Sequence, residues 1–69
     1  MKVSARNVLK GKVKGIKVGV VNTEVVVEIT KGINIAAVIT KESAENLKLA
    51  KGKEVYAIIK ASSVIIGID

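Results

Sequence analysis

The sequence contains no cysteine, no histidine and no proline, and Tyr56 is its only aromatic residue. Without cysteine and histidine, the chain lacks the commonest protein ligands of zinc, haem and iron–sulfur clusters, and it lacks the commonest general base. Disulfides are excluded as well, and nothing indicates an oxidising compartment. These absences argue against catalysis and against a directly ligated metal before any motif is considered.

Hydrophobic runs long enough to cross a membrane are also missing. The N-terminal residues Met-Lys-Val-Ser-Ala-Arg-Asn lack the apolar run of a signal peptide. We therefore expect a cytoplasmic protein with no membrane partner. Acidic residues are scarce too, because 12 Lys and Arg against six Asp and Glu give a formal charge of +6. This charge favours an anionic partner.

β-Branched residues are what the chain has in excess. Of its 69 residues, 12 are Val, 10 are Ile and 3 are Thr, whereas Leu occurs only three times. Such side chains pack well on pleated surfaces and are indifferent helix formers, so the composition predicts an all-β protein. A chain this short forms a single domain, residues 1–69, with a small core. Because neither disulfides nor a metal supplement that core, we predict an oligomer.

Alternating side chains predict the first two strands, and largely apolar stretches predict others. Residues 9–16 place three lysines on one face, and the glycines on the other face predict a bend or bulge. Residues 33–40 are apolar on both faces, so we expect one of these faces to meet another subunit. The predicted strands cover residues 9–16, 20–30, 33–40, 54–60 and 63–68, and the predicted helix covers residues 41–48.

This order of elements predicts the architecture. A short helix between strands 3 and 4 of five is the organisation of the OB-fold, a small Greek-key barrel. An SH3-like barrel is the competing small all-β fold, and the position of the helix disfavours it. We therefore predict an all-β, five-stranded, OB-fold-like Greek-key barrel.

Templates of enzyme active sites are absent. A Ser/His/Asp or Cys/His arrangement is impossible without histidine. The acidic residues are scattered, and Glu24 and Glu28, four apart on one predicted strand, are too exposed for paired acid–base work. Neither a GxGxxG motif nor a P-loop occurs. The sequence therefore predicts a protein that is not an enzyme, with no catalytic residue and no catalytic cofactor.

Three polar clusters remain, and each has a structural interpretation beside a functional one. Ser4, Ala5 and Arg6 are either a frayed terminus or a segment whose accessible N–H groups and charge bind an oxyanion. Thr40 and Ser43 lie at the start of the predicted helix. On the structural interpretation Thr40 is a helix cap, whereas on the functional one the free N–H groups and the Ser43 hydroxyl bind an anion.

The third cluster, Lys60, Ala61 and Ser62, lies between the last two predicted strands. Its structural interpretation is a polar turn with a solvated lysine. On the functional interpretation, buried neighbours partly shield the Lys60 ammonium, which then binds a dianion more strongly than a surface lysine does. All three clusters are rich in hydrogen-bond donors and, apart from Glu42, contain no carboxylate.

These clusters, in this order, resemble the Mop domain of the molbindins, small cytoplasmic proteins that bind molybdate and tungstate. The resemblance covers the whole chain and rests on Ser4-Ala5-Arg6-Asn7 before Leu9-Lys10-Gly11, Ala37-Val38-Ile39-Thr40 before Ser43, Leu47-Lys48-Leu49 before Gly52, and Ile58-Ile59-Lys60-Ala61.

The resemblance implies a barrel assembled as a homo-hexamer, a trimer of dimers, that binds molybdate or tungstate between subunits for storage and homeostasis. The metal stays an intact oxyanion and no residue ligates it directly. A second kind of site on the threefold axis is implied too, and residues 17–22 are the candidates for it. The oxyanion-binding residues implied by position are Ser4, Ala5, Arg6, Thr40, Ser43, Lys60, Ala61 and Ser62.

Single-stranded nucleic acid is the alternative ligand, because many OB-folds bind single strands and the chain is basic. Such binding relies on aromatic stacking platforms, and Tyr56 is the only aromatic side chain. The sequence therefore favours the oxyanion and predicts no nucleic-acid partner. A purely structural assembly module is a third class, which leaves the clustered donors unexplained.

Overall fold

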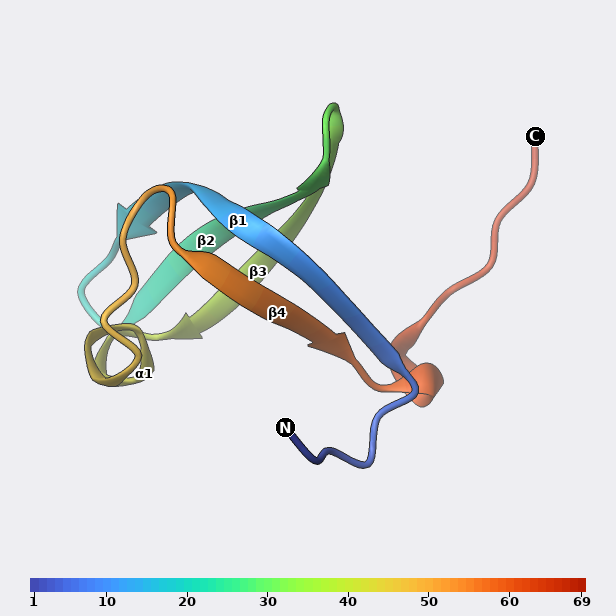
Figure 1. The fold of residues 1–69 in the computed structure, drawn as a ribbon, viewed down its shortest axis with the longest axis horizontal. Coiled ribbons are helices and arrows are strands. Elements are labelled where there is room, and N and C mark those ends of the chain that lie inside the picture. Colours follow the sequence, from blue (N-terminus) through green and yellow to red (C-terminus); the bar gives the residue numbers. More distant parts are fainter.

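The computed structural model describes all residues from Met1 to Asp69 and is built mainly of strands (Figure 1). β-Branched side chains are frequent in the strands, where the pleated backbone accommodates them. The all-β prediction is confirmed, and the third predicted strand has the predicted bounds. The elements are β1 (Asn7–Val18), β2 (Asn22–Thr30), β3 (Ile33–Thr40), α1 (Lys41–Asn46), β4 (Glu54–Ile59) and the 3-10 helix η1 (Ala61–Ser63).

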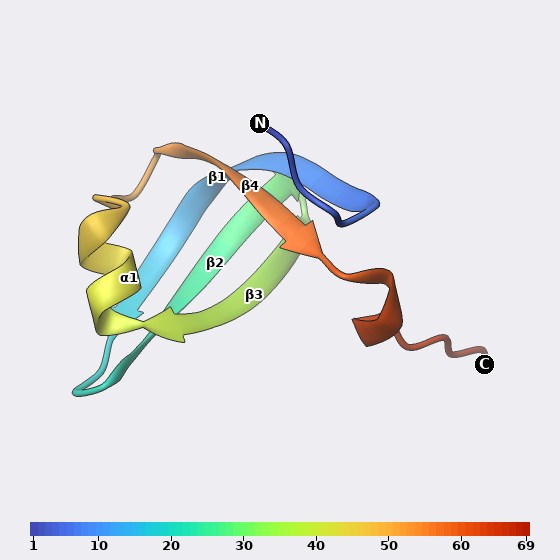
Figure 2. The same cartoon turned by 90° about the horizontal axis from the view of Figure 1, so that it is seen from below.

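The strands form one antiparallel sheet in the order β3-β2-β1-β4. The sheet curls strongly, so that its outer strands β3 and β4 come to face each other across an open side, with α1 at one end (Figure 2). β1 is the longest strand and pairs with both β2 and β4. The result is a partly open barrel of the OB-like kind.

β1 carries the irregularity that its glycines predict. The register between β1 and β2 shifts between Val13 and Gly15, which is a β-bulge. Gly11 is buried, and a Cβ atom there would lie 2.5 Å from the backbone oxygen of Glu28. Glycine at position 11 therefore permits the close approach of β2, whereas a Cβ at Gly15 would meet nothing within 4 Å.

The core of the chain is small. Val13, Val25 and Val27 form its buried apolar cluster, with half-buried aliphatic residues packed against it. Thr23 is fully buried beside them on β2, and its hydroxyl has no hydrogen-bond partner. Many other aliphatic side chains stay exposed, so this single chain leaves much of its apolar surface in contact with solvent.

Helix α1 ends two residues before the predicted end. Lys48 has a positive φ of 53°, which ends the helical backbone. Lys53 satisfies the free carbonyls there, because its ammonium donates to the backbone oxygens of Leu47, at 2.6 Å, and Lys48, at 3.3 Å. The structure holds no helix with the length and apolar character needed to cross a membrane.

The prediction of a fifth strand over residues 63–68 is wrong for the single chain. Residues Ala61–Ser63 form η1, and residues 64–69 have no regular structure and lead away from the barrel (Figures 1 and 2). The physical reason is that a strand needs a partner for its backbone N–H and C=O groups, and this segment pairs with no strand of its own chain.

Candidate functional site

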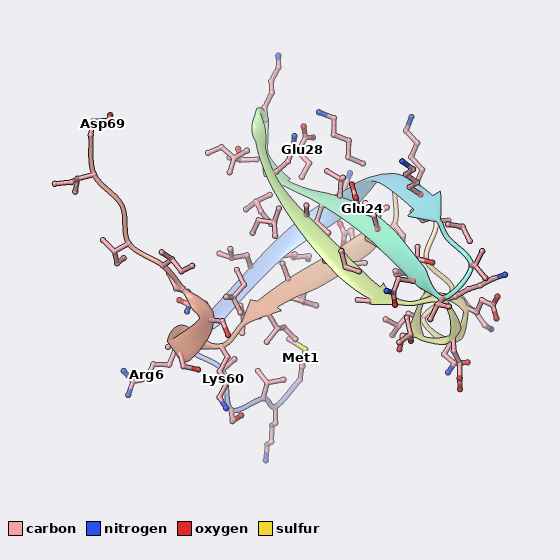
Figure 3. The ribbon with its side chains drawn as sticks, turned by 180° about the vertical axis from the view of Figure 1, so that it is seen from behind. Met1, Arg6, Glu24, Glu28, Lys60 and Asp69 are labelled. Atoms are coloured by element: carbon pink, nitrogen blue, oxygen red, sulfur yellow. The ribbon has the colours of Figure 1, made fainter.

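The first and third polar clusters meet at one end of the barrel. Asn7 and Ile59 are paired residues in the antiparallel ladder of β1 and β4. The segment before β1 and the segment after β4 therefore start from neighbouring positions. Figure 3 shows Arg6 and Lys60 at this same end of the molecule. We call this surface, made of residues 4–6 and 60–62, the terminal cluster.

Backbone donors of the terminal cluster are unused within the chain. Ser4, Ala5 and Arg6 precede the ladder, and their N–H groups donate no hydrogen bond. In η1 the first hydrogen bond is donated by the Ser63 N–H to the Lys60 carbonyl oxygen at 2.8 Å. The N–H groups of Ala61 and Ser62 are therefore also free. These free donors are what an oxyanion requires.

Charge in the terminal cluster has one sign. Arg6 and Lys60 contribute two positive charges, and the cluster contains no Asp or Glu. Of the two interpretations of Lys60, the single chain shows the solvated lysine, because Lys60 is exposed. Lys60 follows the last residue of β4 and lies at the rim, where only another molecule can remove its ammonium from water.

The second cluster forms the start of α1. The hydroxyl oxygen of Thr40 accepts the N–H of Ser43 at 3.0 Å, which confirms Thr40 as the helix cap. The Thr40 hydroxyl in turn donates to the Ser43 hydroxyl oxygen at 2.8 Å. The proton of the Ser43 hydroxyl has no acceptor in the chain, so it is free to be donated to a ligand.

The structure does not bring the second cluster to the terminal cluster. Thr40 on β3 pairs with Asn22 on β2. The next residue of β2, Thr23, pairs with Val18, which is the last residue of β1. The terminal cluster lies at the opposite end of β1, where Asn7 begins the strand. Within one chain these are two separate surfaces, and a single site using both needs a second copy.

The groups that gather at the polar surfaces of this chain are hydrogen-bond donors, and no three His, Cys, Asp or Glu residues come together. The donors that do gather are N–H, hydroxyl, ammonium and guanidinium groups, which bind the oxygens of an anion. The arrangement is suited to holding an oxyanion intact rather than to reacting with it.

The lysine-rich outer face of β1 is partly neutralised. Lys10 lies 3.5 Å from Glu54, and Lys14 lies 3.8 Å from Glu28. Lys12 stands between the same two carboxylates in register, opposite Glu28 on β2 and Glu54 on β4. This face is therefore a mixed-charge surface rather than a continuous basic track for a phosphate backbone.

Comparison with known proteins identifies the family. The model of the TOBE domain matches residues 3–66, which is nearly the whole chain. The chain belongs to the TOBE-domain family. This TOBE chain is 56% identical over 66 residues to the molybdenum transport protein ModE of Azotobacter vinelandii, but spans only 24% of that protein. It is 48% identical to molybdenum-pterin-binding protein 2 of Clostridium pasteurianum and spans 97% of it.

Solved structures agree with this assignment. A molybdate-binding protein from Sporomusa ovata superposes with a TM-score of 0.91 and 37% identity, covering 99% of the TOBE chain and 100% of the other. The cytoplasmic molybdate-binding protein ModG, with molybdate bound, superposes with a TM-score of 0.83 and 56% identity. That match covers 88% of the TOBE chain and 43% of the ModG chain. The predicted resemblance to molbindins is confirmed, and these relatives are binding or transport proteins rather than enzymes.

One functional feature escaped the sequence analysis. The strand predicted over residues 63–68 is absent from the single chain, where Ser63 ends η1 and residues 64–69 form an exposed, mostly apolar segment. The apolar run Val64-Ile65-Ile66 favours a strand, but a run of apolar residues does not show whether a strand edge is available to pair with it.

Proposed function

We propose that this protein binds molybdate or tungstate as an intact oxyanion, between copies of the chain, and serves storage and homeostasis of the anion in the cytoplasm. Residues 1–69 act as one Mop domain, and the assembly is a homo-hexamer arranged as a trimer of dimers. The relatives' names and structures support molybdate as the ligand. One relative, ModG, is described as cytoplasmic, which supports the same compartment here.

The observation that carries this proposal is the pairing of Asn7 with Ile59, which joins two donor segments at one end of the barrel. A tetrahedral dianion accepts hydrogen bonds from every direction and donates none at neutral pH. Its site therefore needs converging donors, positive charge and no competing carboxylate. The terminal cluster offers free N–H groups, hydroxyls, Arg6 and Lys60, and it contains no acidic residue.

A site between copies explains why the donors of one chain approach from one side only. The terminal cluster is mostly exposed, so a bound dianion would still face water across half of its surface. The free hydroxyl proton of Ser43 lies at the opposite end of the barrel. A neighbouring copy that presents its Thr40–Ser43 region, or its own terminal cluster, would enclose the anion and bring Lys60 into a less polar environment.

Single-stranded nucleic acid is the alternative ligand, and the side chains disfavour it. Tyr56 is the only stacking platform and is half exposed on β4. The lysines of β1 are offset by Glu28 and Glu54. Base stacking supplies much of the affinity of OB-fold proteins for single strands, and one aromatic ring cannot supply it along a strand.

Isothermal titration of the intact protein separates the two functions. Molybdate, tungstate, sulfate and a single-stranded oligonucleotide are titrated in turn at one salt concentration. The proposal predicts saturable heat with molybdate or tungstate and no comparable binding of the oligonucleotide. Absence of heat with both metal oxyanions, together with tight binding of the oligonucleotide, would overturn it.

A further inference from the structure

Helix α1, which carries Ser43, is held weakly along its length. It has six residues, and none of them is buried. Ser43 and Ala44 are half-buried, and the rest of the helix is exposed. Helices this short are marginal in water, so contacts at the two ends of α1 must supply much of its stability. The position of the Ser43 hydroxyl therefore depends on how these ends are held.

The first end of α1 is continuous with the sheet (Figure 2). Thr40 is the last residue of β3, and its hydroxyl caps the helix through the Ser43 N–H. The Lys41 N–H donates to the Val21 oxygen at 2.8 Å, just before β2 begins. Hydrogen bonds to the backbone and to a cap thus fix this end to the sheet.

The second end of α1 has the hydrogen bonds of a Schellman motif. The Leu49 N–H donates to the Ala44 oxygen at 3.2 Å, and the Lys48 N–H donates to the Glu45 oxygen at 3.0 Å. Lys48 takes the left-handed conformation of this motif, with a φ of 53°, where glycine is the usual residue. A residue with a Cβ atom is strained in that conformation, so the turn needs support from outside the helix.

The side chain of Lys53, in the loop before β4, gives this support. Its ammonium donates to the backbone oxygens of Leu47, at 2.6 Å, and of Lys48, at 3.3 Å. The helix has no basic residue in its own last turn. Lys53 therefore supplies both the donors for the free carbonyls and the positive charge that the C-terminal end of a helix favours.

The backbone of Lys53 is fixed to the core of the barrel. Its carbonyl oxygen accepts the Val13 N–H at 2.9 Å, and the neighbouring Gly52 N–H donates to the Val13 oxygen at 2.8 Å. Val13 is a core residue of β1 and is 2% exposed. The Lys53 side chain thus leaves a backbone held by β1 and ends on the carbonyls of α1, so it connects the end of the helix to the core strand.

Ser43 lies one turn before the end that Lys53 holds. The Leu47 N–H donates to the Ser43 oxygen at 3.0 Å, and the Leu47 oxygen accepts the shorter of the two hydrogen bonds from Lys53. Two consecutive hydrogen bonds therefore connect Lys53, through Leu47, to Ser43. A displacement of this end of the helix would move Ser43 and its free hydroxyl proton.

We propose that Lys53 is a positioning residue for anion binding. By holding the left-handed end of α1 against β1, it fixes the direction in which the Ser43 hydroxyl is presented. This inference rests on the proposed function, in which Ser43 donates to the anion. Lys53 acts through Ser43 and not by contact with the anion, because its ammonium is directed at the carbonyls of Leu47 and Lys48.

Three single variants isolate the contribution of the Lys53 ammonium. Lys53→Met keeps a long side chain and removes its donors, Lys53→Arg restores donors, and Lys51→Met removes an exposed ammonium from the same loop. Isothermal titration measures the Kd for molybdate at a temperature where thermal unfolding shows every variant folded. Lys53→Met should raise the Kd about 3- to 10-fold, as expected for coupled neighbouring residues. Lys53→Arg and Lys51→Met should each change it by less than about twofold.

The decisive measurement repeats Lys53→Met in a Ser43→Ala background. The hydroxyl that Lys53 positions is then already absent, so Lys53→Met should raise the Kd further by less than about twofold. A purely structural role of Lys53, or a direct effect of its charge on the anion, would not depend on Ser43. The same fold-change in both backgrounds would therefore overturn the proposal.

Lys48→Gly tests why the end of α1 needs Lys53. Glycine adopts a positive φ without strain, so the turn in this background should need less support. Lys53→Met should then raise the Kd by less than about twofold. An undiminished effect of Lys53→Met would contradict the role of Lys53 in holding the left-handed turn.

Titration of the unmodified protein keeps this inference apart from the proposed function. Absence of molybdate binding by the unmodified protein would overturn both. Binding by the unmodified protein, with an equal affinity for Lys53→Met, would overturn this inference alone.

Discussion

Asn7 and Ile59 face each other across the ladder of β1 and β4, although 52 positions separate them along the chain. Their pairing brings the segment Ser4–Arg6 beside the turn that begins at Lys60. The ordinary alignment of two antiparallel strands thus assembles a cluster of donors from both ends of the sequence. The consequences of this relationship for binding and for stability are testable with single substitutions.

Lys60→Ala removes the ammonium of the terminal cluster and is expected to weaken molybdate binding. A charge-assisted hydrogen bond contributes about 1.5–3 kcal/mol, which corresponds to roughly a 10- to 150-fold rise in Kd. Lys51→Ala is the matched control, because Lys51 is exposed in the loop before β4, at the other end of that strand. Isothermal titration measures both. An unchanged isotherm for Lys60→Ala would remove Lys60 from the site.

Ser4→Val removes a hydroxyl from the same cluster and leaves the backbone N–H groups in place. Because molybdate is charged, loss of this hydrogen bond is expected to cost about 1.5–3 kcal/mol and to raise the Kd for molybdate roughly 10- to 150-fold. Because Ser4 is exposed and precedes β1, thermal unfolding should not change. A variant that binds as the unmodified protein does would show that the Ser4 side chain does not contact the anion.

The start of α1 separates a capping role from a binding role. Thr40→Ala loses the cap to the Ser43 N–H and should lower stability by about 1 kcal/mol, whereas Thr40→Ser should keep it. Ser43→Ala keeps that N–H but removes the free hydroxyl proton and the oxygen that accepts the exposed Thr40 hydroxyl, so it should weaken anion binding with little change in stability. Denaturant unfolding measures the stability of the three variants, and isothermal titration measures their affinity for molybdate. Ser43→Ala with unaltered affinity would leave the helix start with a structural role alone.

Gly11 and Gly15 lie on the same strand but differ in their surroundings. A Cβ at Gly11 would lie 2.5 Å from the Glu28 oxygen and 2.8 Å from the Val27 side chain, so Gly11→Ala should destabilise by about 1–3 kcal/mol through overpacking. Gly15→Ala meets nothing within 4 Å and should be neutral or slightly stabilising. The midpoints of denaturant unfolding compare the stabilities of the two variants. Equal stabilities would contradict the close contact of β1 and β2 at Gly11.

Much of the fold could be predicted from the sequence because its signals are local. Residues 33–40, apolar on both faces, predicted the bounds of β3, and the glycines of β1 predicted its bulge. The helix start followed from Thr40, whose cap is formed. The fifth strand could not be predicted correctly for one chain, because an apolar run does not show whether a strand edge is available to pair with it.

The candidate site was predictable in its chemistry and less so in its geometry. Residue types alone indicated donors without carboxylates, and the separations along the chain supported the family. The sequence left open whether Lys60 is shielded or solvated, because the exposure of a lysine at the end of a strand depends on which segments pack beside it, and in the single chain Lys60 is exposed. Strand pairing likewise decides how far Thr40 lies from the terminal cluster. Thr40 lies near the last residue of β1, whereas the terminal cluster lies beside its first residue.

Co-crystals with molybdate, measured at the molybdenum absorption edge, test the central claim most directly. The account predicts an anomalous peak between chains, within hydrogen-bond reach of the N–H groups of Ser4–Arg6 and of the Lys60 ammonium, with the metal still surrounded by its oxygens. A molybdenum peak away from the terminal cluster, or no peak in protein saturated with molybdate, would contradict it.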